Sequence, residues 1–251
     1  MDIQLQILGS GTCVPSLERS ASAALVSLGE TRILVDAGPG TMGQLLRAGV
    51  AIDQVDWILF THFHPDHCSE WVPFLFSTKY PEFNRTKPLH VAGGEGLVYH
   101  YEQLCSIHGS NIQLPSAFFS LLELGESGEF MAGEVAVEFV AVNHKPESRA
   151  FRFSDGAGGS IVYSGDTDYS RALVDLASGA DLFVLEASTP DGEKVPGHLV
   201  PSLAGDMAEQ ARVGRVVLTH LYPACDAVDI KAQCQSYFSG PVTVAQDLMV
   251  V

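Results

Sequence analysis

The most conspicuous shortage in this sequence is of basic residues. Lysine and arginine together number 14 against 30 aspartates and glutamates, which gives a formal net charge of −16 at pH 7. A protein whose main partner is nucleic acid needs clustered basic residues to neutralise phosphates, so this balance weighs against such a partner. Carboxylates that bind metal cations would reverse the local field, so the charge balance alone does not decide the question.

Long apolar runs are also missing. No uncharged apolar stretch reaches about 18 residues, so we expect no transmembrane helix and no membrane partner. The first residues, Met1 to Ile7, alternate polar and apolar side chains and carry neither a basic nor a long apolar region. We therefore interpret them as a first strand rather than as an export signal.

The cysteines follow no pairing pattern. An odd, scattered set with no Cys-x-x-Cys pair does not suggest a disulfide framework, so we expect free thiols and a cytoplasmic protein. The five cysteines are Cys13, Cys68, Cys105, Cys225 and Cys234.

No linker, low-complexity run or short repeat divides the chain, so we expect a single domain over residues 1–251. Strands are predicted at 3–8, 22–28, 31–36, 56–61, 87–92, 135–142, 149–154, 160–165, 181–186 and 215–219, and helices at 40–48, 67–79, 95–108, 168–178, 200–213 and 227–238. Early hairpins followed by alternating strands and helices predict mixed sheets covered by helices. The stretch 109–134, rich in Ser, Gly and Glu, is predicted to be the least regular part.

Four predicted strands run directly into a histidine or an aspartate. In open α/β sheets, sites form outside the carboxyl ends of strands, so we expect these side chains to converge on one edge. A single histidine at a strand end is usually structural, but four such ends together indicate a functional site. The residues that follow the strands are His62, His144, Asp166 and His220.

One of these strand ends carries three histidines and an aspartate within six residues. His62 and His64 are two positions apart, so on an extended segment they point the same way. Pro65 ends the strand, and Asp66 and His67 then lie at the start of the next helix, where they can face a second point. Imidazole and carboxylate suit zinc, and also manganese or iron. The segment therefore predicts ligands for two metal centres.

On these residues the sequence resembles the metallo-β-lactamase superfamily and, within it, the ribonuclease Z-like branch. The resemblance extends from about residue 3 to residue 220 and includes the early segment Leu8-Gly9-Ser10-Gly11-Thr12. The family's motifs match, in the right order, Asp36 in its glycine-rich turn, the segment His62–His67, His144, Asp166 and His220.

The resemblance implies an α/β fold, the αββα sandwich of two mixed sheets flanked by helices, with the site along one edge. It also implies two divalent metal ions that activate a water molecule for attack on the substrate. We expect these ions to be zinc, with manganese or iron as alternatives. Asp66 would also orient or deprotonate that water. His62, His64 and His144 would hold one metal, Asp66, His67 and His220 would hold the other, and Asp166 would bridge them.

The resemblance suggests supporting or substrate roles for further residues. Asp36 would support the loop that presents the histidines, with an ordinary turn residue as the alternative. Glu186 and His198 match an acidic residue and a histidine thought to act at the scissile phosphate or on the leaving oxygen. The family's His-Ser-Thr pattern is replaced here by His198-Leu199-Val200.

Three residues close behind His144 are also candidates. Lys145 or Arg149 would contact a substrate phosphate, the alternative being an ordinary solvated side chain. Ser148 resembles a serine of the family and would donate a hydrogen bond. Beyond this loop, we expect Tyr222 at the pocket entrance and Cys68 to be a small buried residue.

We expect a metal-dependent hydrolase, first of all a phosphodiesterase acting on a small or nucleotide-type phosphodiester. Ribonuclease Z carries a long arm between its third and fourth motifs that grips tRNA, whereas His144 and Asp166 are only 22 positions apart. With the acidic balance, this makes tRNA an unexpected partner. The alternatives are a ribonuclease Z-type tRNA 3′ endonuclease, a lactone, thioester or sulfate-ester hydrolase on the same fold, and a non-enzymatic metal-binding sensor. A homodimer is a further expectation, because dimers are common in this family.

Overall fold

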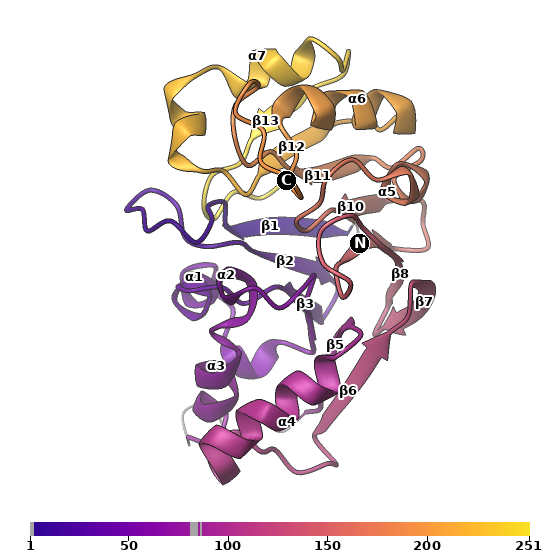
Figure 1. Cartoon of the computed structure of the whole chain (residues 1–251). Coiled ribbons are helices and arrows are strands. Elements are labelled where there is room, and N and C mark those ends of the chain that lie inside the picture. The colour runs from indigo at the N-terminus through magenta and orange to yellow at the C-terminus, as the bar shows by residue number, and fades with distance from the viewer. Residues whose placement is uncertain (1–2, 81–84, 86) are drawn as a thin grey trace.

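Two β-sheets pack face to face with helices on their outer sides, as Figure 1 shows for a computed structural model that describes residues 3–80, 85 and 87–251. Met1 and Asp2, the start of the expected first strand, lie outside the described residues. The first sheet has the order β1 (Gln4–Gly9), β2 (Ala23–Leu28), β3 (Thr31–Val35), β4 (Trp57–Leu59), β5 (Leu89–Gly94) and β6 (Phe119–Leu124).

The second sheet has the order β13-β12-β11-β10-β9-β8-β7. Its strands β10, β11, β12 and β13 pair in parallel, whereas β7, β8, β9 and β10 pair antiparallel, so this sheet is mixed like the first. The strands are β7 (Ser127–Ala132), β8 (Val135–Ala141), β9 (Arg149–Ser154), β10 (Ser160–Tyr163), β11 (Leu182–Glu186), β12 (Val216–Thr219) and β13 (Val242–Val244).

Four helices cover the first sheet and three cover the second (Figure 1). Buried apolar side chains accordingly form three clusters, one between the sheets and one between each sheet and its helices. This is the αββα sandwich that the sequence predicts. The helices are α1 (Thr41–Arg47), α2 (Pro65–Cys68), α3 (Trp71–Ser77), α4 (Leu97–His108), α5 (Arg171–Leu176), α6 (Pro201–Ala211) and α7 (Ile230–Gln235).

The central strands explain why the sequence predicts this core so well. Every residue of β11 and β12 is buried, because these strands have the other sheet on one face and helices on the other. Such strands are continuous apolar runs rather than alternating ones. Among the described residues, none of the helices combines the length and the apolar character needed to cross a membrane.

The stretch 109–134, predicted to be irregular, contains the two strands β6 and β7. Both strands lie at sheet edges, where β6 exposes half and β7 most of its side chains, so neither carries a clear apolar pattern. The short strand β13 is also absent from the prediction. The helix predicted over 67–79 is two helices, α2 and α3. The break falls at Glu70, whose backbone N–H and carboxylate bond the loop from Ala37 to Met42 instead of continuing the helix.

The close approach of β5 to the loop after β8 generates a prediction. A Cβ added at Gly94 would collide with the carbonyl oxygen of Glu147, whereas one at Gly93 would lie 3.4 Å from the Phe63 ring, an ordinary contact. We expect Gly94→Ala to lower the free energy of unfolding by about 2 kcal/mol, because the backbone has to shift. Urea unfolding checks this against Gly93→Ala as the matched control. Equal stability of the two variants would contradict the tight approach.

Candidate metal centre

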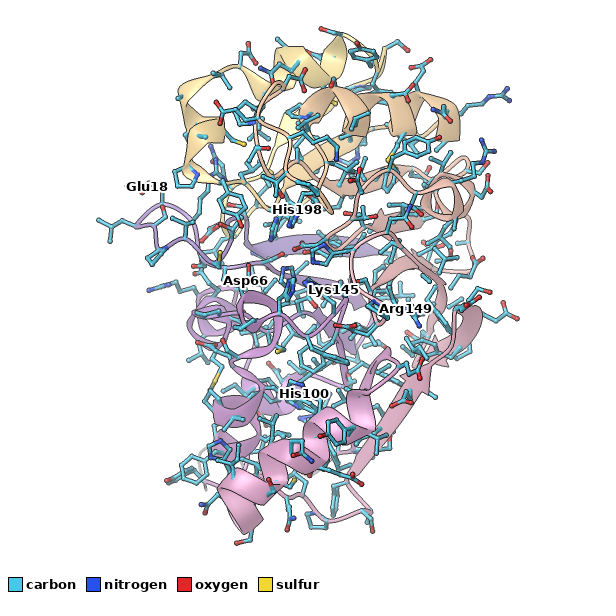
Figure 2. The ribbon with its side chains drawn as sticks, in the orientation of Figure 1. Glu18, Asp66, His100, Lys145, Arg149 and His198 are labelled. Atoms are coloured by element: carbon cyan, nitrogen blue, oxygen red, sulfur yellow. The ribbon has the colours of Figure 1, made fainter. Side chains whose placement is uncertain are left out.

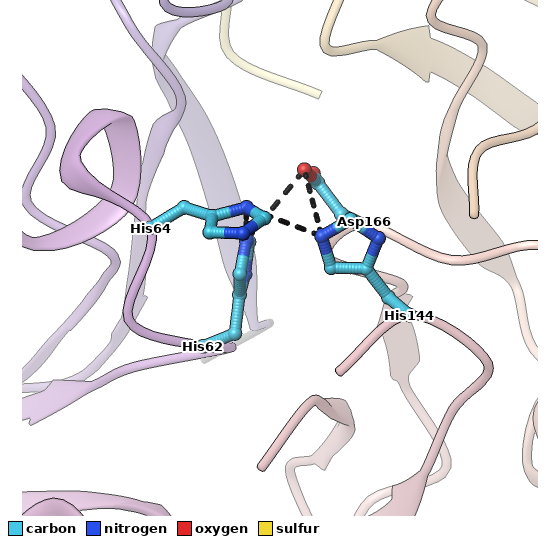
Figure 3. A group of neighbouring side chains, drawn as sticks. All are labelled: His62, His64, His144 and Asp166. Carbon is cyan, nitrogen blue, oxygen red and sulfur yellow. Dashed lines mark hydrogen bonds and ion pairs between the residues drawn. The ribbon is translucent and has the colours of Figure 1, made fainter. Parts of the chain in front are cut away.

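The predicted strand ends converge at the edge shared by the two sheets, near the middle of the molecule, where Figure 2 labels Asp66, Lys145 and His198. Donor atoms of one group, His62, His64, His144 and Asp166, all lie within 4.8 Å of one another (Figure 3). His64 Nδ1 is 3.0 Å from His62 Nε2 and 3.2 Å from His144 Nε2. The geometry thus brings together the four residues expected at the first metal.

A second group consists of Asp66, His67 and His220, again with donor atoms within 4.8 Å of one another. The two imidazole Nε2 atoms are 3.3 Å apart, and Asp66 Oδ2 is 3.7 Å from His220 Nε2. Asp166 Oδ1 is 3.3 Å from both Nε2 atoms. Its other oxygen, Oδ2, faces the first group, 3.7 Å from His62 Nε2. Asp166 therefore stands between the groups, where a bridging ligand is expected.

The donor atoms themselves indicate cations. Asp166 is 3% exposed, and its Oδ1 has no hydrogen-bond partner among the described residues. Imidazole nitrogens point at one another in both groups at 3.0–3.3 Å. A divalent cation would give these nitrogens and the carboxylate a common partner, and His nitrogen with Asp oxygen is a usual donor set for zinc, manganese or iron. The residues therefore fit two metal ions.

Burial sets the charge of the first group. It lowers the pKa of His62 well below the usual value, and it also lowers the pKa of His64 and of His144. Neutral imidazole is the form that binds metal. Burial alone would raise the pKa of Asp166, but the neighbouring charges of His220 and His67 outweigh it and hold that pKa well below its usual range. The group thus presents neutral nitrogens beside an ionised carboxylate.

His67 shows how strongly this site attracts positive charge. Burial opposes its protonation, yet the carboxylates of Asp166 and Asp36 raise its pKa well above the usual value. Since a metal ligand has to give up its proton, a bound cation would take the place of the proton held here.

Three of the histidines are held by the nitrogen that faces away from the site, the arrangement that fixes ring orientation around metals. Asp36 is fully buried and accepts from His67 Nδ1 at 2.8 Å, and also from the amide and hydroxyl of Thr61 at 2.8 Å. His144 Nδ1 donates to the Gly197 carbonyl at 2.9 Å, and His220 Nδ1 hydrogen-bonds with Ser188 Oγ at 3.0 Å. Asp36 therefore stands behind the histidine loop and is more than a turn residue.

His198 lies beside both metal groups. Its ring stacks on that of His220, with centroids 5.6 Å apart, and its Nδ1 is 3.0 Å from Glu186 Oε1 and 3.9 Å from Asp166 Oδ2. Burial would lower the pKa of His198, but the hydrogen bond and charge of Glu186 raise it overall. A ring nitrogen of His198 also lies within 4.8 Å of donor atoms of Asp166 and His220, so these three residues form a third group that could hold a metal ion.

The change from the family's His-Ser-Thr pattern has a structural explanation. Leu199 and Val200 are both buried, and Leu199 belongs to the cluster between the second sheet and its helices. Val200 is the N-cap of α6 and supplies no side-chain cap. His198 is therefore anchored by apolar packing behind it, where the family pattern would place a polar cap.

Arg149 and Ser148, two of the expected substrate residues, form hydrogen bonds with the backbone of their own loop. The Arg149 guanidinium donates to the carbonyl oxygens of Leu124, Gly125, Pro146 and Ser148, and its expected contact with a substrate phosphate stays a prediction. Ser148 is buried, and its Oγ accepts from the backbone N–H of Lys145 at 3.1 Å, while the hydrogen bond that it is expected to donate stays a prediction.

Other expectations fit the structure, and some functional residues escape sequence reasoning. Cys68 is buried and its thiol donates to the Phe63 carbonyl, and Tyr222 lies beside His220 with ring centroids 6.1 Å apart. Ser188 and Gly197 are not predicted to take part. Their only sequence signal is that each lies within two residues of a candidate, Glu186 or His198.

Comparisons with known proteins agree with this fold. The Beta-lactamase superfamily domain matches residues 31–221, a range that includes every ligand named above. An uncharacterized protein of Mycobacterium leprae is 32% identical over 96% of this chain and 85% of its own length. A ribonuclease Z of Mycobacterium sp. (strain KMS) is 28% identical over 98% of this chain and 94% of its own. The crystal structure of the metallo-β-lactamase fold protein YhfI from Bacillus subtilis superposes with a TM-score of 0.87 at 22% identity, covering 100% of this chain and 99% of that one.

Metal removal is the direct test of the site. Chelation should lower the melting temperature by roughly 10 °C, because tightly held ions stabilise only the folded chain. Differential scanning calorimetry measures the shift, and elemental analysis counts the ions. His64→Ala, which removes a ligand, serves as the control and should respond less. A chelator-insensitive melting temperature, with well under one metal per chain in protein never exposed to chelator, would refute the site.

Proposed function

The chain belongs to the β-lactamase superfamily, and from that premise we propose that it is a phosphodiesterase that hydrolyses small or nucleotide-type phosphodiesters. The observation that carries the proposal is the His198–Glu186 pair beside Asp166, with 3.0 Å between His198 Nδ1 and Glu186 Oε1. A phosphodiester needs an acid for its leaving oxygen in addition to the activated water. The site holds a candidate for that acid next to the metal ligands.

The metal ions, when bound, would lower the pKa of a water molecule, to roughly 7 for zinc, and stabilise negative charge on phosphate oxygens. Asp66 borders the same space, with its Oδ2 3.7 Å from His220 Nε2. From there its carboxylate is positioned to orient the attacking water and to accept its proton.

His198 is suited to protonate the leaving oxygen. Glu186 fixes Nδ1 and favours the protonated ring, which leaves Nε2 as the nitrogen available to a substrate. The His198 side chain is 14% exposed, so it is reachable from outside although mostly enclosed. Glu186 also accepts from the amide of Thr167, at 2.7 Å, which ties the acid to the residue after Asp166.

The structure between His144 and Asp166 favours a small substrate over tRNA. This interval is filled by β9, β10 and a tight turn in which Asp155 Oδ1 accepts from the amides of Ala157 and Gly159. No tRNA-gripping arm fits in that interval. The formal net charge of −16 points the same way.

A tRNA 3′ endonuclease is the second candidate function. The relative named ribonuclease Z, at 28% identity over nearly the full chain, is the observation that favours it. Both candidates break a phosphodiester with the same ligands, so they differ in substrate size and not in the chemistry of the site.

We extend the proposal to the metal and the compartment. Zinc is the proposed resident metal because of the histidine-rich donor set. All five cysteines are free thiols, which supports a cytoplasmic location. A homodimer stays a prediction.

The proposal predicts turnover of bis(p-nitrophenyl) phosphate by the metal-loaded protein. His64→Ala should lower kcat/KM by at least about 100-fold, because a ligand lost from one ion disturbs both charge stabilisation and water activation. Release of p-nitrophenolate, followed alongside a lactone, a thioester and a pre-tRNA, measures selectivity. A wild-type rate no higher than that of the variant would end the phosphodiesterase proposal, and preferred cleavage of pre-tRNA would favour the second candidate.

A general acid is needed most where the leaving group is poor. His198→Ala should therefore reduce kcat on an alkyl phosphodiester by about 10²–10⁴-fold and have a much smaller effect with p-nitrophenolate as the leaving group. Kinetics on a matched pair of p-nitrophenyl and methyl diesters test this. His108→Ala, at the end of α4 and outside the site, is the control. Equal losses on both diesters would assign His198 to metal or substrate positioning instead.

A further inference from the structure

The loop that follows His144 presents one cation beside the metal groups. Lys145 is exposed, and no carboxylate lies within ion-pair distance of it in the described part of the chain. Lys145 directly follows His144, whose Nε2 is 3.2 Å from His64 Nδ1, and its positive charge adds to burial and the charge of His144 in lowering the pKa of His64. Figure 2 labels Lys145 near the middle of the molecule, between Asp66 and Arg149.

The backbone that carries Lys145 is fixed. Its N–H donates to Ser148 Oγ at 3.1 Å, and its carbonyl accepts from the Ser148 N–H at 2.9 Å. The Arg149 guanidinium holds the Pro146 carbonyl, and the Arg149 N–H donates to the Thr61 carbonyl at 2.8 Å. Since Thr61 precedes His62, the loop is attached to the strand end that supplies the first metal group.

Other cations around this edge are already engaged. Arg19 pairs with Asp226 at 2.8 Å, Lys194 pairs with Asp168 at 2.7 Å, and Arg149 donates to carbonyl oxygens. Because the chain carries a strong negative charge, an anionic substrate is repelled at long range and has to be held locally. Among the described residues, Lys145 is the cation beside the metal group whose side chain has no ion-pair partner. Its ammonium is therefore available to bind an anionic substrate.

We propose that Lys145 binds a non-bridging phosphate oxygen of the substrate and so selects anionic phosphodiesters over uncharged esters. The inference rests on the proposed function and names the residue that determines its substrate class. The ammonium is a compact point charge on a flexible stem, so it can follow substrates of different shape while the fixed backbone limits its range. Arg149, the other candidate cation of this loop, holds the backbone in place.

Lys145→Met tests the inference through the split between KM and kcat. A charge contact made equally in the bound and the transition states changes KM alone. We expect KM for bis(p-nitrophenyl) phosphate to rise on the order of tenfold, with kcat within about twofold of wild type. The inhibition constant of inorganic phosphate should rise in parallel, and Lys145→Arg should restore most of both values. Lys231→Met, on α7 and distant from the site, is the matched control.

Two results would overturn the inference. One is a Lys145→Met enzyme with the wild-type KM and the wild-type phosphate inhibition constant. The other is a fall in kcat accompanied by loss of bound metal, which would mean that Lys145 only supports the loop. A neutral ester, such as p-nitrophenyl acetate, should show no change in KM where it is turned over.

The Lys145 inference can be tested even if the phosphodiesterase proposal fails. If wild-type protein hydrolyses no phosphodiester, calorimetric titration of metal-loaded protein with inorganic phosphate still decides the role of Lys145. A tenfold weaker phosphate affinity in Lys145→Met would keep Lys145 as an anion contact while the phosphodiesterase proposal falls. Equal affinities would overturn the contact as well.

Discussion

The buried carboxylate of Asp166 is the point on which the architecture of this protein depends. It stands at the end of β10 in the second sheet, and its oxygens reach histidines from both sheets: His62 and His67 from the first, His144 and His220 from the second. Burying one ionised carboxylate is costly, and only several partners directed at it can keep it charged. Those partners follow the ends of three other strands, β4, β8 and β12, so the edges of the two sheets have to meet at one place. The relative position of the two sheets is therefore fixed by the contacts of the site as well as by the packing of the core.

Two residues of the site are positioned by a strained backbone conformation. Asp36 and His220 are not glycines, yet both have a left-handed backbone, with φ of 61° and 57°. This conformation is unfavourable for such residues and persists where surrounding contacts require it. At Asp36 it directs the carboxylate behind His67, and at His220 it turns the ring from the end of β12 into the site. The bonds from Thr61 and Ser188 hold these two residues there.

The features that could be predicted from sequence are those with a local cause. The alternating spacing of His62 and His64, the proline after them and the continuous apolar strands β11 and β12 are local patterns with direct structural consequences. Strands β6 and β7 could not be found this way, because edge strands that bury few of their side chains carry little apolar pattern. Arg149 shows a second limit. Its direction is set by carbonyl oxygens of Leu124 and Gly125, which lie about two dozen residues earlier, and no local motif encodes such a contact.

The loop that follows β11 joins the residues around the metal ligands and the proposed acid His198 in one hydrogen-bonded unit. Its Ser188 hydroxyl donates to Glu186 and also bonds His220, while its Gly197 carbonyl holds His144 and its His198 pairs with Glu186. Glu186 in turn accepts from the amide after Asp166. One segment thus orients a ligand of each metal and the residue suited to protonate the leaving group. A displacement of this segment would disturb water activation and leaving-group protonation together, because the same hydrogen bonds support both. In the proposed reaction, water activation and leaving-group protonation are therefore coupled through the scaffold by Glu186, Ser188 and Gly197, which hold the ligands and the acid from behind.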